Sequence, residues 1–154
     1  MPRPVILILN GPNLNMLGKR EPHIYGTQTL DDIELLCREA ADLCGLDVDF
    51  RQSNSEGELV DWVQQSLGRI HGLVINAAAY THTSLALHDA LKLFSTDIPI
   101  VEVHLSNPKD RESFRHFSYI EPLAFAHYAG YGPKGYQMGL EALAERLGTI
   151  LRQP

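Results

Sequence analysis

Short, continuously apolar runs alternate along this chain with segments whose apolar residues recur at helical spacing. A strand that is apolar throughout, rather than at every second residue, is typical of a sheet buried on both faces. Helical spacing is clearest in residues 30–44, where apolar side chains form one stripe and Gly45 ends the helix. The pattern predicts strands at residues 5–10, 46–51, 72–76, 99–105 and within 122–129, and helices at 30–44, 55–67, 84–94 and 135–151.

This alternation predicts a doubly wound α/β domain, in which helices cover both faces of a parallel sheet. Right-handed crossovers leave few topologies for five strands, and their spacing favours the flavodoxin-like order 2-1-3-4-5. The length is that of one domain, which we expect to span residues 1–154. Ligands of such sheets bind beyond the carboxyl ends of the strands, at the switch point between strands 1 and 3.

Composition narrows the class of protein. The net charge of −6 and the pI near 5.6 argue against a nucleic-acid partner or an anionic membrane surface, because both select basic proteins. The apolar run near the N-terminus is too short for a signal peptide or a membrane span. Cys37 and Cys44 lie too far apart on one predicted helix for a disulfide, so we expect reduced thiols and a cytoplasmic protein.

Polar residues gather where three of the predicted strands end. The carboxyl ends of parallel strands meet at one edge of the sheet, so we expect these side chains to lie close together. They are Asn10, Asn13 and Asn15 after the first strand, Asn76 and residues 80–84 after the third, and Glu102, His104, Ser106 and Asn107 in or after the fourth.

Glu102 and His104 break the apolar pattern of a strand that should be buried. Their spacing of two places both side chains on one face of that strand. A carboxylate in this position can set the tautomer of an imidazole. Departures of this kind are expected at functional sites, so we predict one at this edge.

The segment NGPNLNMLGKREPHIYG at residues 10–26 predicts a long surface loop, because it is rich in glycine, proline and asparagine and has no periodic apolar face. It carries Arg20 and Tyr25. A free phenol is only about 0.1% ionised at neutral pH, and a nearby guanidinium lowers its pKa. The pair can therefore supply a tyrosinate base.

Other motifs are weaker. His82, His88, Glu102 and His104 are candidate metal ligands, but no HxxxH or HExxH spacing accompanies them. Residues 130–135 match GxGxxG yet come last in the chain, so a tight strand-to-helix turn is favoured over a dinucleotide site. Arg111 and Arg115 lie four apart on one predicted helical turn; we interpret Arg111 as part of a solvated face and Arg115 as a cation for a bound anion.

The chain resembles the type II 3-dehydroquinate dehydratases over nearly its whole length. The motifs are NGPNLNMLGKREPHIYG at residues 10–26, RQSNSEGELVDW at 51–62, NAAAYTHTS at 76–84, EVHLSN at 102–107 and RESFRHFSY at 111–119. The resemblance implies dehydration of 3-dehydroquinate to 3-dehydroshikimate in the shikimate pathway, without a metal or organic cofactor. It also implies a homododecamer built as a tetramer of trimers.

The resemblance also implies roles for individual residues. Tyr25 is the base, assisted by Arg20, and His104 is the general acid. Substrate contacts fall on Asn76, His82, Asp89, Leu105, Ser106 and Arg115. From the chemistry of the reaction, rather than from the resemblance, we expect Asn13 to hold a water or the enolate oxygen and Glu102 to orient the ring of His104.

Three residues depart from the pattern usual in that family: Ala78 replaces a common glycine, and Lys109 and Phe117 stand where histidines are frequent. Two other functions stay open at this stage. One is a flavodoxin-like module that binds a nucleotide in the same cleft without catalysis, and the other is a metal-assisted lyase or hydrolase.

Overall fold

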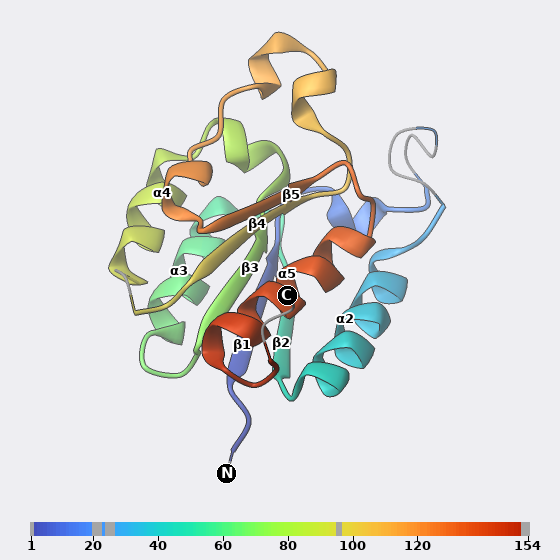
Figure 1. Ribbon diagram of the computed structural model, residues 1–154. Coiled ribbons are helices and arrows are strands. Elements are labelled where there is room, and N and C mark those ends of the chain that lie inside the picture. Colours follow the sequence, from blue (N-terminus) through green and yellow to red (C-terminus); the bar gives the residue numbers. More distant parts are fainter. Residues whose placement is uncertain (1, 20–22, 24–26, 95–96, 152–154) are drawn as a thin grey trace.

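A five-stranded parallel sheet forms the centre of the computed structural model, which describes residues 2–19, 23, 27–94 and 97–151 (Figure 1). The strand order is β2-β1-β3-β4-β5, and every pairing is parallel. This confirms the predicted order. The strands are β1 (Val5–Asn10), β2 (Asp47–Gln52), β3 (Gly72–Asn76), β4 (Ile100–His104) and β5 (Ala126–Ala129).

Helices cover both faces of the sheet and enclose two apolar cores (Figure 1). On β1, Ile6 and Ile8 enter one core while Leu7 and Leu9 enter the other, so this strand is apolar throughout because both of its faces are buried. The first core is closed by α2 (Leu30–Cys44) and α5 (Lys134–Leu147), and the second by α3 (Glu56–Ser66) and α4 (Leu85–Leu91).

Side-chain caps fix where these helices begin. Thr29 and Asp32 form a reciprocal capping box at the start of α2. The Ser55 hydroxyl accepts a hydrogen bond from the Glu58 backbone N–H at the start of α3, and Ser84 caps α4 in the same way. The Ser84 cap places α4 directly after the polar segment that follows β3.

Several predicted boundaries were wrong. The expected strand over 122–129 is a strand only in its last four residues, because Pro122 lies in a 3-10 turn and has no N–H to donate to a neighbouring strand. The helix expected over 84–94 is α4 followed by a 3-10 turn. The last helix ends at Leu147, since Gly148 adopts a left-handed backbone with φ 79°.

The two cysteines are buried and free, as predicted. Burial raises the pKa of the Cys37 thiol to about 12, so this thiol stays protonated and acts as a core residue. In the part of the chain that the structure describes, no helix has the length and apolar character needed to cross a membrane.

Candidate active site

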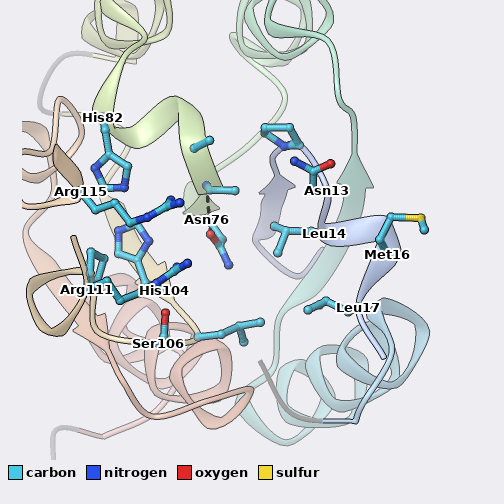
Figure 2. Close-up of a pocket in the computed structure, with 15 residues that line it drawn as sticks. Asn13, Leu14, Met16, Leu17, Asn76, His82, His104, Ser106, Arg111 and Arg115 are labelled. Carbon is cyan, nitrogen blue, oxygen red and sulfur yellow. Dashed lines mark hydrogen bonds between the residues drawn. The ribbon is translucent and has the colours of Figure 1, made fainter. Parts of the chain in front are cut away.

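A cleft of about 120 Å³ opens at the carboxyl edge of β1, β3 and β4, at the predicted switch point. Figure 2 shows side chains from these strand ends and from the segment after β4 converging on it. The residues that line it are Pro12, Asn13, Leu14, Met16, Leu17, Asn76, Ala78, Ala79, His82, His104, Leu105, Ser106, Pro108, Arg111 and Arg115.

Glu102 and His104 form a buried pair on one face of β4, as their spacing predicted. The His104 Nε2 atom lies 2.7 Å from Glu102 Oε2, and the side chains are 8% and 1% exposed. Because Nε2 is engaged by the carboxylate, Nδ1 is the ring nitrogen left to meet a ligand. The pair therefore presents an oriented imidazole at the cleft.

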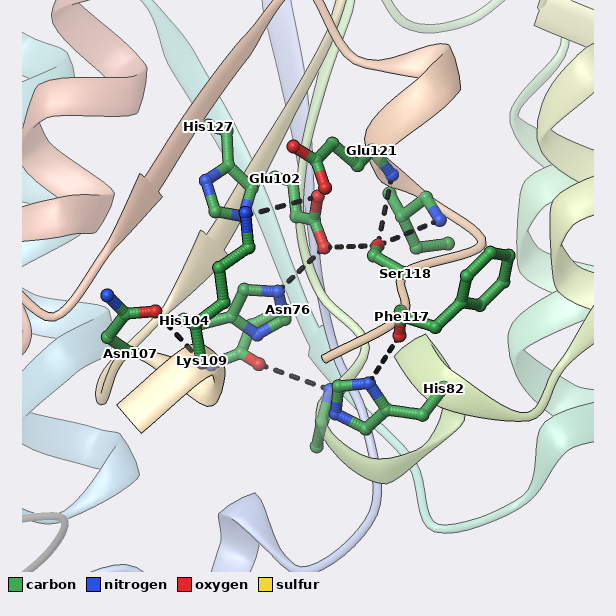
Figure 3. A network of polar contacts seen from close by, with 12 residues as sticks. Asn76, His82, Glu102, His104, Asn107, Lys109, Phe117, Ser118, Glu121 and His127 are labelled. Carbon is green, nitrogen blue, oxygen red and sulfur yellow. Dashed lines mark hydrogen bonds and ion pairs between the residues drawn. The ribbon is translucent and has the colours of Figure 1, made fainter. Parts of the chain in front are cut away.

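Ser118 fixes the carboxylate of Glu102 from the other side (Figure 3). Its hydroxyl donates to Glu102 Oε2 over 2.7 Å and accepts from the backbone N–H groups of Ile120 and Glu121. Burial alone raises the pKa of Glu102, but the hydrogen bond and charge of His104, with smaller effects of Ser118 and His127, hold that pKa below its ordinary value. Glu102 is therefore an anion.

His82 faces the same cleft from the segment after β3 (Figure 2). Its Nδ1 lies 2.7 Å from the carbonyl oxygen of Phe117, so the ring donates from Nδ1. Burial lowers the pKa of His82, and the Phe117 carbonyl only partly offsets this effect. A neutral His82 leaves Nε2 as a hydrogen-bond acceptor.

A buried polar chain holds Asn76 at the floor of the cleft. The Asn76 Nδ2 group donates to the Tyr136 hydroxyl over 3.0 Å, and this hydroxyl donates to Asn10 Oδ1 over 2.6 Å. Burial raises the pKa of Tyr136, so its proton is retained. The ends of β1 and β3 are thereby tied to α5.

Asn13 begins a 3-10 turn with a left-handed backbone, φ 69°, which asparagine tolerates better than most residues. Its backbone N–H donates to Asn54 Oδ1 over 2.9 Å. Gly11 precedes this turn and packs so closely on the Ala77 backbone that a side chain would not fit. The loop after β1 is thus held against the segment after β3.

Two arginines face the cleft, and one prediction about them was wrong. Arg111 is not on a solvated face: its side chain is 17% exposed and, like that of Arg115, it lines the cleft. Arg115 Nε lies 3.2 Å from Glu112 Oε1, and Arg111 Nε lies 3.9 Å from the same oxygen. Figure 2 shows both guanidinium groups turned toward the cleft.

The structure brings together most of the predicted site. Asn13, Asn76, His82, His104, Leu105, Ser106 and Arg115 line the cleft, and Glu102 supports His104 from behind. Asp89 lies exposed on α4 and does not line it. Arg20 and Tyr25 lie outside the described residues, so their predicted roles stay predictions.

His127 was missed by sequence reasoning. It pairs with Glu102 across β4 and β5, and its Nε2 lies 3.5 Å from Glu102 Oε1. A histidine in an otherwise apolar edge strand was the available signal. Of the candidate metal ligands His82, His88, Glu102 and His104, the described residues bring only Glu102 and His104 into one compact group of possible ligand atoms, together with His127.

The turn at residues 130–135 joins β5 to α5, as predicted, with Gly130 and Gly132 at φ 88° and 61°. Ala78 also has a positive φ, 52°. It is the position where the resembling family commonly carries glycine, and glycine adopts this conformation without strain.

Comparison with known proteins agrees with this geometry. The model of the family described as "Dehydroquinase class II" matches residues 4–144. The chain is 54% identical over 141 residues to the 3-dehydroquinate dehydratase 2 of Pseudomonas aeruginosa, covering 92% of this chain and 94% of that protein. It is 56% identical over 139 residues to the 3-dehydroquinate dehydratase of Azorhizobium caulinodans, covering 90% and 92%.

Solved structures give the same result. The type II dehydroquinase from Butyrivibrio crossotus has a TM-score of 0.88 and 42% identity over 92% of this chain and 97% of that one. The type II dehydroquinase from Propionibacterium acnes has a TM-score of 0.86 and 44% identity, covering 91% and 95%. This chain belongs to the class II dehydroquinase family.

Proposed function

We propose that this protein is a lyase that dehydrates 3-dehydroquinate to 3-dehydroshikimate. The observation that carries the proposal is the buried Glu102–His104 pair at the edge of a cleft that also holds Arg111 and Arg115. Relatives that match nine-tenths of the chain or more bear the name 3-dehydroquinate dehydratase. His104 can donate a proton to a departing hydroxyl, and the two arginines can bind the carboxylate of the same substrate.

His104 acts as the general acid toward the departing hydroxyl. Glu102 holds Nε2, so Nδ1 delivers the proton, and the buried carboxylate stabilises the charged imidazolium before delivery. A proton donor placed in this way contributes about 10²–10⁴-fold to the rate. Nothing in this step requires a metal or an organic cofactor.

Tyr25 acts as the base that removes the proton next to the substrate carbonyl. A guanidinium within about 4–6 Å lowers a phenol pKa by roughly 1–3 units, and Arg20 supplies it without competing for the proton. Asn13 stabilises the enolate oxygen or a water bound to it. Asn13 lines the cleft opposite His104, which is consistent with this division of roles.

The remaining residues hold the substrate. The backbone N–H groups of Leu105 and Ser106, with Arg115, bind the carboxylate, because planar guanidinium and paired amides both match its oxygens. Asn76 supports the leaving hydroxyl, and His82 and Asp89 contact the ring hydroxyls. Asp89 is exposed and does not line this chain's own cleft, so it would reach a substrate only from a neighbouring copy.

An oligomer would let Asp89 of one copy reach the cleft of another, and the resemblance specifies a homododecamer, a tetramer of trimers. Phe114 and Phe117 are 68% and 60% exposed in the segment after β4 and offer apolar surface for such contacts. The free, buried thiols support a reducing compartment, the cytoplasm. Mass measurement by light scattering tests the assembly.

A direct assay tests the reaction. Adding 3-dehydroquinate should produce the ultraviolet absorbance of a conjugated enone, and chelator should not reduce the rate. His104→Ala should lower kcat by about 10²–10⁴-fold. Tyr25→Phe should abolish turnover while retaining substrate binding; a Tyr25→Phe variant of normal activity would place the base elsewhere. No enone from the wild-type protein would overturn the proposal.

A further inference from the structure

We propose that Glu102, His104 and His127 form an inhibitory site for a transition-metal dication of the zinc type. Among the described residues, these three offer ligand atoms that all lie within 4.8 Å of one another. His104 is on one side of the carboxylate and His127 on the other, with ring centroids 5.7 Å apart. Two imidazoles and one carboxylate are a common protein ligand set for zinc.

One oxygen of the cluster lacks a hydrogen-bond partner. Glu102 Oε1 is buried and makes no hydrogen bond, while Oε2 accepts from both His104 and Ser118. His127 Nε2 lies 3.5 Å from Oε1, beyond a good hydrogen bond. An unsatisfied buried acceptor is unfavourable, and a dication bound at Oε1 would remove that penalty.

The present distances are close to those of a metal site. With bonds of about 2.0–2.1 Å, tetrahedral ligand atoms lie about 3.3 Å apart. The His127–Glu102 pair is at 3.5 Å and the His104–Glu102 pair at 2.7 Å. All ligand atoms lie within 4.8 Å of one another, so a separation at that limit must shorten by about 1.5 Å when a metal binds. His127 is the most exposed of the three side chains and has the most room to move.

A second, smaller cavity of about 20 Å³ adjoins the cluster. It is lined by His104 and His127 together with Ser118, and it has room for one water as a fourth ligand. Lys109 and Arg115 also line it. Their positive charges oppose any cation, so the site should reject the weakly held Mg²⁺ and Ca²⁺ and retain metals with high affinity for imidazole.

Metal at this site would take His104 Nε2 and Glu102 away from each other. With a metal on Nε2, His104 could not become an imidazolium, and the neutral Nδ1–H that remains is a much weaker acid toward the departing hydroxyl. This consequence rests on the proposed function, whereas the binding itself does not.

Calorimetry and cobalt spectroscopy on the purified, chelator-treated protein test binding without any assay of turnover. Zn²⁺ should bind with a stoichiometry of one per chain, and Co²⁺ should give the visible absorption bands of a tetrahedral site. His127→Val should weaken Zn²⁺ by at least about tenfold, since one of three ligands is lost. His71→Gln is the matched control, because His71 caps the far end of the sheet at Val5 and should leave Zn²⁺ affinity unchanged.

Dehydratase assays in zinc buffers then test inhibition. Wild type should lose activity as Zn²⁺ occupies the site, while His127→Val, with each rate expressed relative to its own zinc-free rate, should resist the same zinc concentration. Lys109→Gln should raise the affinity for Zn²⁺, because it removes one positive charge that opposes the bound cation. Equal zinc affinity of wild type and His127→Val would overturn the site. If Zn²⁺ bound at His127 but did not inhibit an active enzyme, the inhibitory role would be overturned. If the protein bound Zn²⁺ but showed no dehydratase activity, only the proposed function would be contradicted.

Discussion

The Tyr136 hydroxyl accepts a hydrogen bond from Asn76, a residue 60 positions earlier in the chain, and donates one to Asn10, 126 positions earlier. One phenol on α5 therefore connects the ends of β1 and β3, where the cleft begins. All three side chains are at most 3% exposed. A buried hydroxyl that serves both as donor and as acceptor fixes the orientation of two amides at once.

Tyr136→Phe should therefore destabilise the fold and misplace Asn76. It keeps the ring but leaves Asn10 Oδ1 and Asn76 Nδ2 without their partner, at a cost of about 1–3 kcal/mol in the free energy of unfolding. Urea unfolding measures that cost, and kcat/KM should fall as well. Tyr131→Phe, at a position 56% exposed, is the control and should leave both quantities unchanged. Equal stability of Tyr136→Phe and wild type would contradict the role assigned to the hydroxyl.

Glu102→Gln should lower kcat by roughly 10²-fold, because a neutral amide cannot stabilise a charged His104. It should also change the dependence of stability on pH. The folded pKa of Glu102 lies below its ordinary value of 4.5. Its contribution to stability is therefore complete above pH 4.5 and is lost as the pH falls through the lower, folded pKa.

The difference in unfolding free energy between wild type and Glu102→Gln should accordingly be constant at neutral pH and shrink as the pH falls below 4.5. Denaturant titrations at a series of pH values measure it. Glu39→Gln, exposed on α2, removes the same charge elsewhere and should show no such change. A difference that grows on acidification would have the wrong sign for a depressed carboxyl pKa.

Ala78→Gly should stabilise the protein. At φ 52° an alanine is strained by roughly 1–2 kcal/mol, and glycine removes this strain while adding about 0.4–1 kcal/mol of unfolded-state entropy. The net gain should be about 0.5–1 kcal/mol. Ala77→Gly is the contrast, because its φ of −75° is ordinary and glycine there should destabilise. Thermal unfolding of both variants gives the comparison, and a lower melting temperature for Ala78→Gly would refute it.

The topology could be predicted from the sequence because the central strands are buried on both faces and are therefore apolar throughout. Val5–Asn10 and Gly72–Asn76 match their predicted bounds for that reason. The edge strand β5 was the least well predicted. With one neighbour and partly exposed residues, Ala126–Ala129 carries little of the apolar signal that marked the others.

The site could be predicted only as far as local spacing determines it. Glu102 and His104 share a strand, so period two places them on one face. His127 joins them through the register between β4 and β5, which no local pattern contains. Arg111 was misplaced because it has an extended backbone, φ −114° and ψ −163°, between two 3-10 turns, rather than the helical turn that its spacing suggested.

Gly11→Ala should be strongly destabilising for a steric reason. The added Cβ would clash with the Ala77 carbonyl oxygen and lie 2.6 Å from the carbonyl carbon, both of them backbone atoms that cannot turn aside. We expect a loss of about 1–3 kcal/mol, measured by urea unfolding. Gly57→Ala, in the first turn of α3 with only the Ser55 hydroxyl at 3.9 Å, should instead stabilise by about 0.5–1 kcal/mol. If Gly11→Ala were at least as stable as wild type, as Gly57→Ala should be, the close packing of Gly11 would be unimportant for stability.

Arg115→Ala and Arg111→Ala should each weaken substrate binding more than they slow the chemical step. Both guanidinium groups line the cleft, and a hydrogen bond to a charged group contributes about 1.5–3 kcal/mol, so KM should rise by roughly tenfold or more for each variant. Their side chains are 23% and 17% exposed, so the wild-type KM should also rise with ionic strength. A carboxamide analogue of the substrate is the control: it carries no charge, and its affinity should hardly differ among wild type, Arg111→Ala and Arg115→Ala. If Arg115→Ala raised KM and Arg111→Ala did not, Arg111 would line the cleft without binding the anion. The carboxylate would then be held by Arg115 and the backbone amides of Leu105 and Ser106 alone.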